Sequence, residues 1–89
     1  MTHPLITILD DTREIRDLLA SALNDAGFAT QSFARATDFE RAIPSLSPDL
    51  CIIDLGLPDK DGFGVVARMA SETGAAILII SVRAAVWAA

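Results

Sequence analysis

Three short apolar runs, each with acidic or hydroxyl side chains at or near its carboxyl end, constrain the fold of this chain most strongly. They are 5–9 (LITIL), followed by Asp10 and Asp11; 49–55 (DLCIIDL), which contains Asp54; and 76–81 (AILIIS), which ends in Ser81. Continuous apolar runs of this length are typical of strands buried on both faces, as in a parallel sheet. The sequence therefore predicts buried parallel strands that carry polar groups at their carboxyl ends.

An amphipathic segment separates the first run from the rest of the chain. From Thr12 onward, apolar residues recur at spacings of three and four, and they are Ile15, Leu18, Leu19, Ala22 and Leu23. This spacing gathers them on one face of a helix of about four turns. Gly27 follows and is expected to stop the helix.

One weaker strand and two further helices complete the pattern. The pattern over residues 28–33 favours a strand. A short helix is expected to follow, with Thr37 as its cap and its end before Pro48. A third helix is predicted over residues 63–71, and Gly74 is expected to end it. Strands and helices thus alternate, giving four strands and three helices. This order predicts an α/β fold in which a parallel sheet carries helices on both faces through right-handed crossovers.

Charge and composition exclude several classes of function. The net charge is −5 and the seven Lys and Arg residues are scattered, so we expect no direct nucleic acid binding and no contact with anionic membranes. No apolar stretch reaches the ~18–20 residues that span a bilayer, and no signal peptide is visible, which indicates a cytoplasmic protein. Cys51 is the only cysteine and lies inside an apolar run, so it is expected to be a small buried side chain.

The strand ends predict where chemistry can take place. In open parallel sheets, ligands bind at the carboxyl ends of strands where the strand order reverses, so Asp10, Asp11, Asp54 and Ser81 are expected to meet there. Neighbouring carboxylates repel one another unless a cation offsets their charge. Mg²⁺ prefers carboxylate and carbonyl oxygens and keeps several waters, which leaves room for a phosphoryl oxygen. Alternatively, Asp10 or Asp11 caps the following helix, and Ser81 is a plain strand-end hydroxyl.

Three segments taken together carry a family resemblance. They are the strand end ILDD, the segment D-L-G-L-P-D-K-D-G from Asp54 to Gly62, and the strand ILIIS that ends at Ser81. The combination resembles the receiver domains of two-component response regulators, which have a flavodoxin-like (CheY-like) fold. Such domains are phospho-accepting modules and not turnover enzymes.

The resemblance implies a role for each matching residue. Asp54 is similar to the aspartate that accepts a phosphoryl group from a sensor histidine kinase or phosphotransfer protein. Mg²⁺ or another divalent cation would be bound by Asp11, Asp54 and the backbone carbonyl of Gly56. Asp10 would bind the same ion partly through water. Ser81 is similar to the residue that contacts the phosphoryl group and acts as a switch.

The match also has departures. Residues 1–83 resemble a truncated receiver domain that lacks the last strand and helix of the family, and residues 84–89 form a short Ala-rich tail that could begin a helix or a dimer contact. In the family, the missing strand carries a lysine that pairs with the phosphoryl oxygens. Lys60, the only lysine here, lies in the loop after Asp54 and is not assigned that role. Val82 departs as well, because a small residue usually stands there.

Truncation suggests a second function. An uncovered fourth strand is a template for pairing, so we expect a homodimer through this strand and the tail, which includes Trp87. The alternative to a working phospho-acceptor is therefore a phosphorylation-impaired receiver that acts as a dimerisation or kinase-interaction domain. A phosphatase of the haloacid dehalogenase type is disfavoured, because that family needs D-x-D-x-T after its first strand.

Overall fold

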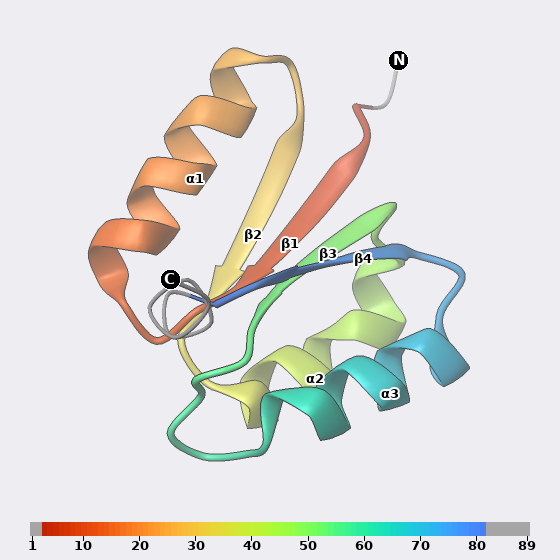
Figure 1. Ribbon diagram of the computed structural model, residues 1–89. Helices are drawn as coiled ribbons and strands as arrows, with labels where there is room; N and C mark the ends of the chain where they lie inside the picture. Colours follow the sequence, from red (N-terminus) through yellow and green to blue (C-terminus); the bar gives the residue numbers. More distant parts are fainter. Residues whose placement is uncertain (1–2, 82–89) are drawn as a thin grey trace.

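Strands and helices alternate along the chain, as the hydrophobic pattern predicts. The computed structural model describes residues 3–81. Its elements are β1 (Leu5–Leu9), α1 (Arg13–Asp25), β2 (Ala29–Phe33), α2 (Ala36–Leu46), β3 (Leu50–Asp54), α3 (Gly62–Glu72) and β4 (Ala76–Ile80) (Figure 1). The predicted four strands and three helices are confirmed.

The strands form one parallel sheet with the order β2-β1-β3-β4. In its register, Leu9 of β1 lies opposite Ile53 of β3, which in turn lies opposite Ile79 of β4. Because all strands run in the same direction, their carboxyl ends share one edge of the sheet. β1 and β3 are adjacent although a whole strand and two helices separate them in sequence, so the order reverses between them, as a flavodoxin-like fold requires.

Apolar side chains pack on both faces of the sheet. One face carries α2 and α3, and its core contains Leu9, Ala36, Phe39, Ile43, Cys51, Ile53, Val65 and Met69. The other face carries α1, and its core is smaller, consisting of Ile6, Ile8 and Ile52 with partly buried neighbours. Figure 1 shows α1 on one side of the sheet and the α2–α3 pair on the other. Helices on both faces are thus confirmed, as is the burial of Cys51.

The two faces are covered unequally. Within the described part of the chain, α1 has no buried residue, and Leu18 on its predicted apolar stripe is 65% exposed. Leu19 and Leu23 of the same stripe do pack against the sheet. On this face, Leu18 of α1 and Leu78 of the outer strand β4 therefore keep apolar surface exposed.

The start of α2 corrects one prediction. Thr37 does not cap this helix, because the helix begins one residue earlier, at Ala36. Arg35, at the N-cap position, makes no side-chain capping bond. The backbone amides of Ala36 and Thr37, at the start of the helix, donate instead to Asp59. Asp59 lies 23 residues further along the chain from Ala36. The stop of α1 is as predicted, since Gly27 adopts φ +99° just after the helix.

Some predictions fall outside residues 3–81. The tail at 84–89 and the dimer contact of Trp87 lie there and stay predictions, and Val82, where the sequence departs from the family, lies there as well. Among the described helices, none combines the length and apolar character that crossing a bilayer requires.

Candidate metal and phosphoryl site

Parallel pairing of β1 and β3 positions the two central carboxylates. Asp10 directly follows β1, and its backbone N–H donates to the Phe33 carbonyl at 3.1 Å, which extends the strand by one residue. Asp54 is the last residue of β3. Since Leu9 pairs with Ile53, the next residue of each strand, Asp10 and Asp54, emerges side by side at the sheet edge.

Three predicted acidic residues gather at this edge. Asp10, Asp11 and Asp54 each offer a carboxylate oxygen, and these oxygens lie within 4.8 Å of one another. Asp10 is only 4% exposed, Asp54 is half-buried and Asp11 is exposed. The cluster is therefore anchored in the protein interior and open to solvent on one side.

Local hydrogen bonds hold two of the carboxylates in place. Asp10 Oδ1 accepts from the Thr12 amide at 2.8 Å, and Asp54 Oδ1 accepts from the Gly56 amide at 3.1 Å. Arg16 Nη1 donates to the Asp10 backbone carbonyl at 2.9 Å. The alternative that Asp10 or Asp11 caps α1 is wrong, because Thr12 occupies the N-cap position and Asp10 bonds the amide of Thr12 itself. Asp10 belongs to the acidic cluster.

The cluster carries negative charge that the described residues do not balance. Burial raises the pKa of Asp10, and the neighbouring Asp54 and Asp11 carboxylates raise it further, although the hydrogen bond from Thr12 opposes this. None of the salt bridges among residues 3–81 involves the three aspartates. A donor set of three close carboxylates with one open side suits a hard divalent cation.

A cavity of about 380 Å³ opens above the cluster. Its polar lining is Asp10, Asp11, Thr12, Asp54, Gly56 and Ser81. All five residues that the sequence predicted for the site therefore line one cavity. Its apolar wall, formed by Ile15, Leu18 and Leu19 of α1 and Ile80 of β4, was not predicted. Helical periodicity shows that these α1 residues share a face, but it cannot show that the face borders a polar cavity.

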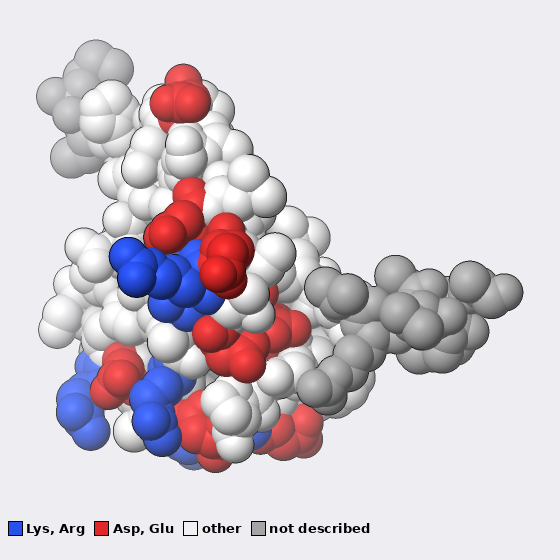
Figure 2. Space-filling model, turned by 90° about the vertical axis from the view of Figure 1, so that its left-hand side faces the viewer, with Lys and Arg blue, Asp and Glu red and all other residues white. Residues whose placement is uncertain are grey.

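Among residues 3–81, Arg16 bonds the Asp10 backbone carbonyl, but no basic side chain forms a salt bridge with the acidic cluster. Lys60 pairs with Glu40 and does not line the cavity, which agrees with leaving the family lysine's role unassigned. On the face shown in Figure 2, Lys and Arg are interspersed with Asp and Glu. That face therefore presents no continuous basic surface.

Comparison with known proteins decides the family. The sequence matches the response regulator receiver domain over residues 6–88. The chain belongs to this family. The strand-end aspartates of the receiver domain and the cavity above them are thus part of a recognised signalling module.

Two relatives illustrate the match. The receiver domain is 43% identical over 60 residues to the transcriptional regulatory protein GltR of Pseudomonas aeruginosa. This aligned segment covers 67% of this chain and 25% of GltR. It is 35% identical over 78 residues to the transcriptional regulatory protein KdpE of Staphylococcus aureus, covering 88% of this chain and 34% of KdpE. The chain thus spans a quarter to a third of the length of these relatives.

The fold agrees with solved receiver structures. A CheY-like response regulator receiver domain from Methylobacillus flagellatus superposes with a TM-score of 0.83 at 23% identity. The superposition covers 90% of this chain and 70% of that one. The predicted flavodoxin-like, CheY-like architecture is therefore confirmed.

Proposed function

We propose that this receiver domain accepts a phosphoryl group on Asp54, in a Mg²⁺-dependent transfer from a sensor histidine kinase or a phosphotransfer protein. The observation that carries the proposal is the meeting of Asp10, Asp11 and Asp54 within 4.8 Å at the mouth of one cavity. Structural ion pairing does not account for this cluster, because the salt bridges among residues 3–81 leave it out.

The transfer is a displacement at phosphorus. A carboxylate oxygen of Asp54 forms the new O–P bond while the bond between phosphorus and the donor's histidine nitrogen breaks. The electron pair of the broken bond stays on the imidazole nitrogen, and Asp54 becomes an acyl phosphate. The receiver domain acts once per phosphoryl group and is not a turnover enzyme.

The donor set fits a magnesium ion. Asp10, Asp11, Asp54 and the Gly56 carbonyl would hold it, and all four residues line the cavity. When bound, the ion would neutralise the phosphoryl oxygens and the crowded carboxylates. The Asp54–Gly56 hydrogen bond of 3.1 Å keeps the nucleophile and the carbonyl-bearing residue close together.

Ser81 is proposed to contact the phosphoryl group and to act as the switch. It lines the same cavity directly after β4, where a hydroxyl can donate to a phosphoryl oxygen. Ser81 directly follows Ile80, the last residue of the edge strand β4. A change in the contact of Ser81 would therefore reach β4 first.

Intact mass after treatment with a small phosphodonor and Mg²⁺ tests the proposal. We expect the native domain to gain the mass of one phosphoryl group. Asp54→Asn should abolish the gain, because an amide is not a nucleophile at phosphorus. Omitting Mg²⁺ should suppress it in the native domain.

Asp25→Asn serves as the matched control. It makes the same chemical change at an exposed aspartate at the end of α1, so phosphorylation should be retained. Failure of the native domain to gain mass with several phosphodonors would contradict the proposal and favour a phosphorylation-impaired interaction domain.

A second candidate function is self-association. The edge strand β4 exposes Leu78 to 50% and Ile79 to 44% among the described residues. Apolar side chains on a free strand edge favour pairing with another chain. We propose that the domain forms a homodimer through β4, with the tail at 84–89 contributing, and that it works in the cytoplasm without binding nucleic acid or membranes directly.

A further inference from the structure

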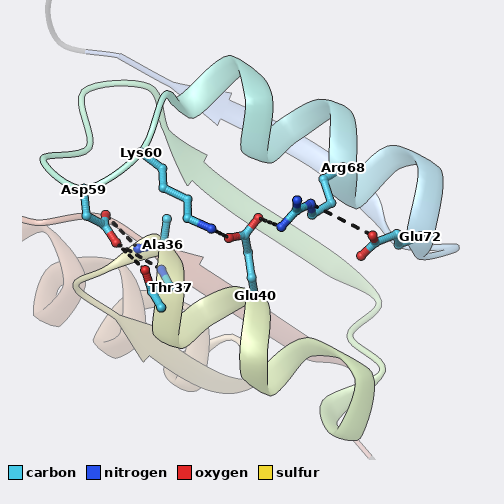
Figure 3. Close-up of polar contacts among 7 residues, drawn as sticks. All are labelled: Ala36, Thr37, Glu40, Asp59, Lys60, Arg68 and Glu72. Carbon is cyan, nitrogen blue, oxygen red and sulfur yellow. Dashed lines mark hydrogen bonds and ion pairs between the residues drawn. The ribbon is translucent and has the colours of Figure 1, made fainter.

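The loop that follows the phospho-acceptor is tied to α2 at two consecutive residues. This loop, residues 55–61, carries Gly56 and connects β3 to α3. Figure 3 shows Asp59 and Lys60 of the loop reaching to the first turns of α2. The two side chains bond different parts of the helix, so together they restrict both sliding and rotation of the loop.

Asp59 bonds the N-terminus of α2. Its Oδ1 accepts from the Ala36 amide at 3.0 Å, and its Oδ2 accepts from the Thr37 amide at 3.1 Å and the Thr37 hydroxyl at 3.0 Å. These bonds lower the pKa of Asp59 to about 2. A residue of the loop thus performs the capping that Arg35 does not perform.

Lys60 bonds the next turn of α2. Its Nζ donates to Glu40 Oε1, while Arg68 Nη1 of α3 donates to Glu40 Oε2 at 2.9 Å (Figure 3). The Glu40 side chain is only 11% exposed, whereas Lys60 is 40% exposed. Glu40 is therefore a nearly buried carboxylate shared by the loop and α3, and its two partners can be removed separately.

The other end of the loop is fixed by close backbone packing. A Cβ on Gly62 would lie 2.5 Å from the Leu55 Cα. Leu57, between these positions, packs against the main core. With both ends and its apolar side chain held, the contacts of Asp59 and Lys60 decide the remaining freedom of the segment that contains Gly56.

We propose that Lys60, acting with Asp59, is a positioning residue that holds the 55–61 loop on α2 and thereby sets the affinity of the acidic site for Mg²⁺. This inference rests on the proposed function, because the proposed function makes the Gly56 carbonyl a ligand of the metal. Lys60 acts from outside the site and touches neither the ion nor the phosphoryl group.

The sign of the effect separates positioning from electrostatics. Replacing Lys60 with a neutral residue makes the domain more negative, which by Coulomb attraction alone strengthens Mg²⁺ binding. A loosened 55–61 loop, in contrast, weakens Mg²⁺ binding, because the Gly56 carbonyl is then held less firmly. We expect Lys60→Met to raise the Mg²⁺ Kd about 10-fold, the lower end of the range for residues that support a metal ligand. Lys60→Arg should restore a value close to that of the native domain.

Calorimetric titration with MgCl₂ at fixed ionic strength measures these affinities. Arg68→Met is the matched control, because it removes the same charge from the same Glu40 but leaves the loop contact intact. Its Kd should stay close to the native value. In the phosphorylation assay, Lys60→Met should need more Mg²⁺ for half-maximal rate, while the rate at saturating Mg²⁺ recovers.

Hydrogen exchange without metal gives an independent readout. The Gly56 amide, which donates to Asp54, should exchange faster in Lys60→Met, with no change for the amides of β1. Equal or tighter Mg²⁺ binding by Lys60→Met, or equal weakening by Arg68→Met, would overturn the proposal while leaving the proposed function intact. If the native domain binds no Mg²⁺, the proposed function fails, and the affinity claim fails with it.

Discussion

At the scale of the residue, Asp10 combines a local hydrogen bond with a place in the acidic cluster. It bonds the Thr12 amide at 2.8 Å and contributes to a cluster of three carboxylates. Burial and two like charges make its ionised form costly, which the raised pKa reflects. Its position is consistent with a site whose charge is completed by a bound cation.

Gly62 is the residue where backbone packing leaves least room. An added Cβ would lie 2.5 Å from the Leu55 Cα and 2.7 Å from the Leu55 carbonyl oxygen, and backbone cannot give way as a flexible side chain would. We expect Gly62→Ala to lower the free energy of unfolding by about 1–3 kcal/mol, as overpacking usually does. Urea unfolding followed by circular dichroism measures it.

Gly64→Ala provides the comparison for this prediction. A Cβ there meets nothing within 4 Å, and the residue lies in the same helix. Since alanine favours a helix by about 1 kcal/mol over glycine, this variant should be as stable as the native domain or more so. Equal effects of the two substitutions would show that close packing at Gly62 is unimportant.

At the scale of the element, α2 depends on a cap that comes from elsewhere in the chain. The Asp59 carboxylate must be ionised to accept bonds from both amides and the Thr37 hydroxyl with full strength. Its pKa is about 2 in the folded domain against an ordinary value of 3.8. The folded state therefore binds fewer protons than the unfolded state between these two values.

This difference predicts the pH dependence of stability. A lowered folded-state pKa contributes stability that is fully present above the unfolded value of 3.8 and is lost as the pH falls through about 2. We expect the native domain to be more stable than Asp59→Asn at neutral pH, with the gap closing below pH 3.8. Urea midpoints measured across this range check it, and a gap that does not change with pH would contradict the role of Asp59.

At the scale of the whole molecule, the two faces of the sheet differ in cover. The α2–α3 face holds the larger core, whereas α1 alone covers the other face of the described sheet. Leu18 and Leu78 remain exposed on the α1 face. Ile79 lies beside Ile53 on the α2–α3 face and is exposed at the outer strand β4. The exposed surface includes the edge strand β4, which ends at the cavity, so association there would lie next to the proposed phosphoryl site.

Light scattering coupled to size-exclusion chromatography tests self-association. We expect a dimer at micromolar concentration, and Leu78→Lys should shift it towards monomer, because a charge on an edge strand opposes pairing. Phe63→Lys is the control, since Phe63 is exposed to 66% but lies on α3. A native domain that is monomeric and folded at this concentration would refute the dimer.

The sequence by itself determined the element order, the parallel sheet and the meeting of Asp10, Asp11, Asp54 and Ser81 at one cavity. These follow from local hydrophobic period and from the rule that parallel strands share a carboxyl edge. Only the tertiary structure decided that Asp59 caps α2, that Glu40 binds both Lys60 and Arg68, and that Leu18 stays exposed. Caps across 23 residues and shared ion pairs depend on which segments lie together in space, and local periodicity carries no information about that.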